Sequence, residues 1–111
     1  RPAGNEPAGA EPMTLEDWRR KIDDIDRRLV ELLNERSTCV LEIGKLKKTD
    51  GMALYQPDRE REVLDAAERA NRGPLSEGAI RRLFERILDE ARSVERAVMH
   101  DDAEQGSEKK S

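Results

Sequence analysis

Apolar side chains recur every three or four residues over most of the chain, and this spacing predicts three helices. The members of the first series are Leu15, Trp18, Ile22, Ile25, Leu29, Leu32, Val40 and Ile43. Steps of three and four place them on one face of a helix that runs from about Leu15 to about Lys48. Thr14 and Asp17 have the spacing of a capping box at its start, and Gly51 is the first strong stop after it.

Two shorter helices are predicted after this stop. Pro57 suits the first turn of a second helix, which opens at "QPDRERE" and is ended by "NRGP". Ser76 is the N-cap of a third helix. Its apolar positions are Ile80, Leu83, Phe84, Ile87, Leu88, Ala91, Val94 and Val98. No segment has the alternation of a strand, so the predicted fold class is all-α, with a long first helix and shorter second and third helices.

The two ends of the chain lack this periodicity. Residues 1–12, "RPAGNEPAGAEP", consist mainly of Pro, Gly, Ala and Glu and predict a disordered N-terminal arm. Residues 100–111, which include "DDAEQGSEKKS", predict a disordered C-terminal tail for the same reason. The 111 residues therefore indicate one domain, at residues 13–99.

The first predicted helix is too long for the rest of its own chain to cover. From Leu15 to Lys48 it measures roughly 50 Å at 1.5 Å per residue. A compact domain of this size has a radius of gyration of only about 13 Å. Because an exposed apolar face of this length is unfavourable, we expect a second copy of the chain to cover it. The sequence thus predicts an intertwined helical homodimer.

Composition narrows the classes of function. Charged residues make up 41% of the chain, but the formal net charge is -4, which argues against a nucleic-acid surface. No apolar run is long enough to span a membrane, and the N-terminus lacks the apolar segment of a signal peptide. Cys39, the one cysteine, suggests a reducing cytoplasm and is expected to be a small core residue. One His and one Cys do not predict a metal site.

Charged residues nevertheless fall on each predicted apolar face. Arg36 lies midway between Leu29 and Ile43 in a seven-residue repeat. Lys47 follows Arg36 by eleven residues, about three turns, and so projects from nearly the same face. In the second helix Glu60 lies one turn before Val63 and Leu64. In the third helix Glu95 ends the row of Phe84, Leu88 and Ala91.

Each of these charges has a simple structural explanation. Long side chains can reach water past apolar neighbours, and Arg36 could pair with Glu60 in the interior. All four together are harder to explain in this way, because an unpaired buried charge is strongly unfavourable. Two cations and two acids facing a helical core favour a pocket for a small, multiply charged ligand. Arg and Lys suit carboxylates or phosphates on that ligand.

Arg19 could join this pocket only from a second chain. It precedes Arg36 by seventeen residues, about 25 Å along one helix, so the two cannot reach one small ligand together. In an antiparallel dimer, Arg19 of one chain can approach the Arg36 region of the other. Taken alone, an Arg at such a position is more often a solvated surface residue.

Three segments together resemble the all-helical chorismate mutases, the AroQ class. They are "WRRKIDDIDRRLVELLNERSTCVLEIGKLK", "PDREREVL" and "IRRLFERILDEARSVE", and the resemblance extends from about Met13 to about Met99. It implies a dimer of three-helix chains in which the long first helix is shared between two active sites. It also implies the pericyclic rearrangement of chorismate to prephenate in phenylalanine and tyrosine biosynthesis, without cofactor or metal.

The resemblance also implies roles for particular residues. Arg36 of one chain and Arg19 of the other would bind the two substrate carboxylates, with Arg59 on the same side of the pocket. Lys47 would donate to the ether oxygen of the breaking bond, where negative charge develops. Glu60 would accept a hydrogen bond from the ring hydroxyl.

Three positions depart from the best-known bacterial pattern of that family. Glu95 stands where that pattern has Gln, facing the ether oxygen from the side opposite Lys47. A carboxylate cannot donate there, but a protonated Glu can. Ala91 stands where the pattern has Ser, so one hydroxyl contact to the substrate is absent. Gln56 replaces an acidic residue that helps to bind the ring hydroxyl.

Three other interpretations fit part of this pattern. An isochorismate-pyruvate lyase on the same fold would use a similar cationic pocket. A helical dimerisation module without chemistry would explain the apolar faces but not the inward charges. A regulatory remnant would bind the ligand without converting it.

Overall fold

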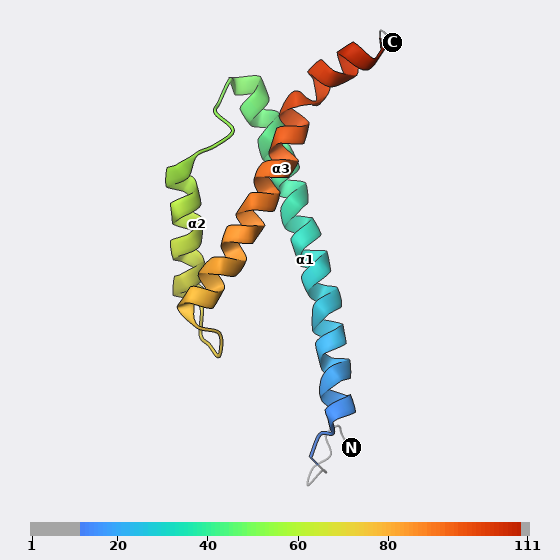
Figure 1. The fold of residues 1–111 in the computed structure, drawn as a ribbon, viewed down its shortest axis with the longest axis vertical. Helices are drawn as coiled ribbons and strands as arrows, with labels where there is room; N and C mark the ends of the chain where they lie inside the picture. The colour runs from blue at the N-terminus through green and yellow to red at the C-terminus, as the bar shows by residue number, and fades with distance from the viewer. Residues whose placement is uncertain (1–11, 110–111) are drawn as a thin grey trace. The chain divides into compact units, whose positions relative to one another are not determined.

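A computed structural model describes residues 12–109 of the chain, with side chains up to residue 100. It contains three helices, α1 (Leu15–Asp50), α2 (Pro57–Ala70) and α3 (Glu77–Lys109) (Figure 1). No strand occurs in residues 12–109, so the predicted all-α fold class is confirmed. Nearly all of the predicted N-terminal arm, residues 1–12, lies outside the described part of the chain.

Local hydrogen bonds explain where α1 begins and ends. The Thr14 N–H donates to Asp17 Oδ2 at 3.0 Å, and the Asp17 N–H donates to Thr14 Oγ1 at 3.1 Å, which confirms the predicted capping box. The Thr14 N–H lowers the pKa of Asp17 from its ordinary value of 3.8. At the other end Gly51 has a φ of 69°, and the Met52 N–H donates to the Lys47 carbonyl at 2.8 Å. These are the marks of a Schellman motif, which stops the helix.

The starts of α2 and α3 also follow the sequence. Pro57 occupies the first turn of α2, as predicted, and Gln56 is its N-cap without a side-chain capping bond. The hydroxyl of Ser76 accepts a hydrogen bond of 3.0 Å from the Ala79 N–H and caps α3.

The end of α3 extends past its apolar face to Lys109. The disordered tail that the composition of residues 100–111 suggests stays a prediction. No proline interrupts this segment, and Ala, Glu, Gln and Lys are good helix formers, so α3 can propagate beyond its apolar face.

The chain divides between Glu35 and Arg36 into two units, which are described separately. The first unit contains the N-terminal part of α1, and its apolar face is exposed in the single chain. The exposed fractions are 64% for Leu15, 51% for Trp18, 53% for Ile22, 40% for Ile25, 50% for Leu29 and 57% for Leu32. Within the described residues, no helix is both long enough and apolar enough to cross a membrane.

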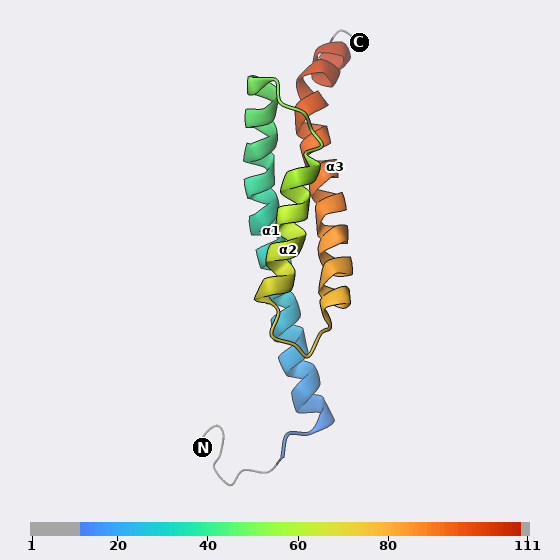
Figure 2. The ribbon, with the colours of Figure 1, turned by 90° about the vertical axis from the view of Figure 1, so that its left-hand side faces the viewer.

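The second unit holds the C-terminal part of α1 together with α2 and α3. Helices α2 and α3 pack side by side (Figures 1 and 2). The guanidinium of Arg81 on α3 joins them, because its Nη1 lies 2.9 Å from Glu68 Oε2 and 3.7 Å from Asp65 Oδ1 on α2. The buried apolar core of this unit is small and consists of Val40, Leu64 and Leu88.

At Gly44, α1 and α3 approach each other closely in the second unit. A Cβ atom built on this buried glycine would lie 3.4 Å from the Glu95 Cα and 3.4 Å from the Val98 Cβ. The absence of a side chain lets the two backbones meet, and Lys47, about one turn further along α1, reaches Glu95 as a result.

Cys39 corrects one expectation. The sequence predicted a core residue, but the Cys39 side chain is exposed, whereas its neighbour Val40 is buried. A residue next to the buried row on a helix lies about 100° away from it, which is enough to leave the packed face.

Candidate active site

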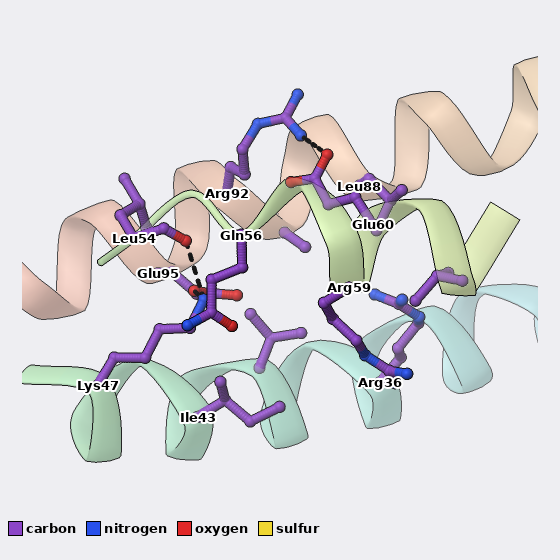
Figure 3. A pocket seen from close by; sticks show the side chains of 13 residues that line it. Arg36, Ile43, Lys47, Leu54, Gln56, Arg59, Glu60, Leu88, Arg92 and Glu95 are labelled. Carbon is purple, nitrogen blue, oxygen red and sulfur yellow. Dashed lines mark hydrogen bonds and ion pairs between the residues drawn. The ribbon is translucent and has the colours of Figure 1, made fainter. Parts of the chain in front are cut away.

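The second unit encloses a pocket of about 300 Å³ between its three helical segments (Figure 3). This volume is at the lower end of the range for small-molecule sites. Apolar side chains and charged groups both line it. The lining residues are Arg36, Val40, Ile43, Lys47, Leu54, Gln56, Arg59, Glu60, Val63, Leu88, Ala91, Arg92 and Glu95. All three helical segments of the unit, and the loop between α1 and α2, therefore contribute to one site.

Most residues singled out in the sequence meet at this pocket. They are Arg36, Lys47, Gln56, Arg59, Glu60, Ala91 and Glu95. Arg19 is not among the lining residues. It belongs to the first unit, is exposed, and its Nη1 lies 3.8 Å from Glu16 Oε1. The shared lining is a geometric finding, and the chemical roles of these side chains stay predictions.

Lys47 and Glu95 form a buried ion pair at one end of the pocket. Lys47 Nζ lies 2.6 Å from Glu95 Oε1, and the two side chains are only 10% and 12% exposed. The same ammonium donates to the Leu54 carbonyl at 2.9 Å. An ammonium carries three N–H groups, so two fixed hydrogen bonds orient it and leave a third donor for a ligand.

This contact adds a partner for Glu95 that the sequence did not predict. The family resemblance implied that Lys47 and Glu95 face a substrate oxygen from opposite sides, and that role stays a prediction; in the structure the two side chains also contact each other. The close approach of α1 and α3 at Gly44 accounts for this, because Glu95 lies at that contact and Lys47 follows Gly44 by about one turn of α1. In this arrangement Glu95 accepts a hydrogen bond from Lys47 and holds the ammonium in place.

Arg36 and Arg59 gather at the other end of the pocket (Figure 3). Arg36 is half-buried, and no carboxylate of the described residues lies within ion-pair distance of its guanidinium. Arg59 is exposed and pairs with Glu62 one turn away, at 3.2 Å. Guanidinium groups bind carboxylates in a planar, two-pronged geometry, so this end of the pocket suits an anionic ligand.

The sequence left open an ion pair between Glu60 and Arg36, but the two residues do not pair in the structure. Glu60 Oε1 instead accepts a hydrogen bond of 2.5 Å from Arg92 Nη1 on α3. The Arg92 guanidinium also contacts Asp89, and its central carbon lies 5.9 Å from the Tyr55 ring centre. The hydrogen bond to Glu60 raises the pKa of Arg92 above its ordinary value.

Arg92 and the Leu54 carbonyl are the parts of this site that the sequence did not reveal. Arg92 lies four residues after Leu88, on the flank of an apolar row, and this position was its only signal. The use of a backbone carbonyl to hold Lys47 leaves no signal in the sequence.

The two remaining candidate residues bring less chemistry. The Gln56 side chain extends into the pocket near Lys47 (Figure 3). Ala91 presents only a methyl group. Residues 12–100 contain no group of three or more His, Cys, Asp or Glu side chains that could hold a metal ion.

The chain is similar in sequence to proteins of one known family. Residues 18–96 match the family model described as chorismate mutase type II. The chain is 42% identical over 80 residues to a bifunctional chorismate mutase/prephenate dehydratase of Neisseria gonorrhoeae, covering 72% of the chain and 22% of that protein. A protein of the same description from Stutzerimonas stutzeri is 32% identical over 89 residues, covering 76% of the chain and 24% of that protein. The chain thus spans less than a quarter of the length of these relatives.

A solved structure has the same fold. The structure of chorismate mutase (form II) from Thermus thermophilus superposes with a TM-score of 0.73 and 34% sequence identity. The match covers 74% of the chain and 93% of that protein chain. The family model matches residues 18–96, which are most of the chain, so the chain belongs to the chorismate mutase type II family.

Proposed function

We propose that the chain is a chorismate mutase, which converts chorismate to prephenate in phenylalanine and tyrosine biosynthesis. The observation that carries the proposal is Arg36, a half-buried guanidinium without a carboxylate partner among the described residues. It shares a pocket with Lys47, whose ammonium is held in a fixed orientation. Family membership supports the same reaction. The lone cysteine supports a reducing compartment, the cytoplasm, as its location.

The reaction requires little covalent chemistry from the protein. An ether C–O bond breaks while a C–C bond forms in the same molecule, and no atom enters or leaves. The catalytic contribution is to hold the flexible substrate in a compact conformation and to stabilise charge in the transition state. Neither task needs a nucleophile or a cofactor.

The pocket residues divide these tasks between its two ends. Arg36 and Arg59 bind the carboxylates at one end. At the other end the third N–H of Lys47 donates to the ether oxygen, where negative charge grows as the bond breaks. This donation is strengthened because the site is shielded from water. Glu60 accepts from the ring hydroxyl, and Gln56 and Ala91 line the same space.

We propose that the working form is a homodimer in which Arg19 of the partner subunit completes the pocket. The exposed apolar face of α1 supports it, because Trp18, Ile22 and Leu29 are each at least half exposed in the single chain. Leaving so much apolar surface in water is unfavourable, and a second chain covers it.

Product analysis tests the reaction. Purified protein is mixed with chorismate, and the products are followed by NMR. We expect prephenate to form faster than in buffer alone. Salicylate and pyruvate from isochorismate, with no prephenate from chorismate, would favour the related lyase instead.

The substitution Arg36→Ala tests the site at the same time. It should lower kcat/KM about a hundredfold or more, since one charged contact to the substrate is lost. The fold should be unchanged or stabilised, because a half-buried charge without a partner is removed. Arg86→Ala, an exposed substitution on α3, is the matched control and should retain activity. Retained activity in Arg36→Ala would contradict the proposed site.

A mixing experiment tests the shared site. Arg19→Ala and Arg36→Ala are each expected to be inactive as homodimers. A mixed dimer keeps one pocket with both arginines, so unfolding and refolding the two together should restore about a quarter of wild-type turnover. No recovery, with mixed dimers shown by mass spectrometry, would refute the contribution of Arg19 across the interface.

A further inference from the structure

Arg92 connects three parts of the second unit at the edge of the pocket. Its Nη1 lies 2.5 Å from Glu60 Oε1 on α2, and its Nη2 contacts Asp89 one turn earlier on α3. Its guanidinium lies over the ring of Tyr55 in the loop between α1 and α2. The Arg92 and Glu60 side chains are 27% and 21% exposed, so this pair is largely withdrawn from water.

We propose that Arg92 is a positioning residue that fixes the Glu60 carboxylate for the ring hydroxyl of the substrate. The inference rests on the proposed mutase function. Arg92 engages one carboxylate oxygen of Glu60, and the second oxygen then accepts from the substrate.

The geometry explains why this position uses an arginine. A glutamate side chain has three rotatable bonds, and holding it in one conformation has an entropic cost that a strong partner offsets. The planar guanidinium bonds Glu60 through one nitrogen and Asp89 through another, and its central carbon lies over the Tyr55 ring, 5.9 Å from the ring centre. A lysine would keep the charge but could not reproduce this forked arrangement.

This role predicts a particular kinetic change. The hydroxyl of the substrate is present both in the ground state and in the transition state. A contact made equally in both states changes KM and leaves kcat nearly unchanged. A purely structural role for Arg92 would instead lower the fraction of folded protein, which reduces the apparent kcat and leaves KM alone.

A double-mutant cycle on the full chain tests the proposal, with chorismate as the substrate. The variants are Arg92→Met, Arg92→Lys, Glu60→Gln and the pair Arg92→Met with Glu60→Gln. We expect Arg92→Met to raise KM about tenfold, the effect of losing one charge-assisted hydrogen bond. Arg92→Lys should lie between Arg92→Met and wild type, and Arg92→Met should add little to Glu60→Gln.

Arg86→Met is the matched control for this cycle. Arg86 lies on the same helix, its side chain is 74% exposed, and it pairs only with Glu90 one turn away among the described residues. Its substitution should leave both kinetic constants unchanged. Thermal unfolding of every variant checks that the fold is retained.

Four outcomes would overturn the inference. An equal loss from Arg92→Met with and without Glu60→Gln would show that Arg92 does not act through Glu60. A fall in kcat at unchanged KM would show a structural role. An unchanged KM in Arg92→Met, with an active wild type, would refute positioning while leaving the mutase proposal intact. An inactive wild type would instead refute the mutase proposal, and this inference with it.

Discussion

Replacing the buried pair of Lys47 and Glu95 separates its role in the fold from its role in the chemistry. The variants are Lys47→Met, Glu95→Leu and the two combined. Methionine has nearly the length of lysine, and leucine is close in volume to glutamate, so neither leaves a large cavity. The pair is short, at 2.6 Å, and both side chains are almost fully buried, so solvent screens it little.

The structure sets the size of the expected effect. Removing one partner leaves the other charge buried without compensation, which costs about 3–5 kcal/mol. The Leu54 carbonyl also loses its Lys47 donor in the methionine variants, which adds about 1 kcal/mol. The whole free energy of unfolding of a domain is only about 5–15 kcal/mol, so each single variant is strongly destabilised.

The double variant should behave differently. It contains no uncompensated charge, and replacing a complete buried pair by apolar groups is often neutral or stabilising. We expect its free energy of unfolding to return to within about 1–2 kcal/mol of wild type, the remaining loss coming from the Leu54 carbonyl. It should nevertheless fail to convert chorismate, because the donor proposed for the ether oxygen is gone.

Urea unfolding followed by circular dichroism measures these differences. All variants are compared at one protein concentration, since association with a second chain would shift the apparent stability. Chorismate turnover is measured on the same preparations. Additive losses in the double variant would refute the interior pairing. Wild-type turnover in the double variant would remove Lys47 from the proposed chemistry.

Two further predictions concern the contact of α1 with α3 at Gly44 and the cap of α1 at Asp17. Gly44→Ala should be tolerated, because its Cβ would make ordinary contacts at 3.4 Å and alanine favours helix. Gly44→Val should lower the midpoint of thermal unfolding, because the larger side chain overpacks the contact. Equal midpoints for the two variants would contradict the close approach of α1 and α3. The lowered pKa of Asp17 means that its capping contribution is complete above its ordinary value of 3.8 and is lost as pH falls through the lower folded value. The difference in thermal midpoint between wild type and Asp17→Asn should therefore shrink between about pH 5 and about pH 2, and a constant difference would refute this contribution of the cap.

The sequence predicted those features that depend on neighbours along one helix. The capping box of Thr14 and Asp17 needs only a spacing of three residues. The inward direction of Arg36, Lys47 and Glu95 follows from the helical period, because a charge on an apolar row must face the interior that the row packs against. For that reason the sequence predicts the all-α fold class and most of the charged residues that line the pocket.

Features that depend on distances between helices were not predictable in this way. The contact of Lys47 with Glu95, rather than with a ligand alone, results from how closely α1 and α3 approach at Gly44. Likewise the partner of Glu60 is Arg92, and helical spacing does not distinguish Arg92 from other arginines on α3. Helical periodicity predicts the face of the helix on which a side chain lies, but not the residue that it contacts on another element.

The charged side chains that line the pocket have a net positive charge, whereas the chain as a whole has a net negative charge. The lining includes four cationic and two acidic side chains, within a chain of formal net charge -4. A small dianion in solution is therefore repelled by the molecule at long range and attracted only near the mouth of the pocket, which favours encounters there over encounters elsewhere on the surface. Added salt screens this local attraction, so the rate of substrate capture should fall with ionic strength while the rate of the bound substrate's rearrangement stays constant. Multivalent inorganic anions such as sulfate should compete for the same guanidinium groups, so the salt chosen for an assay becomes part of the measured affinity.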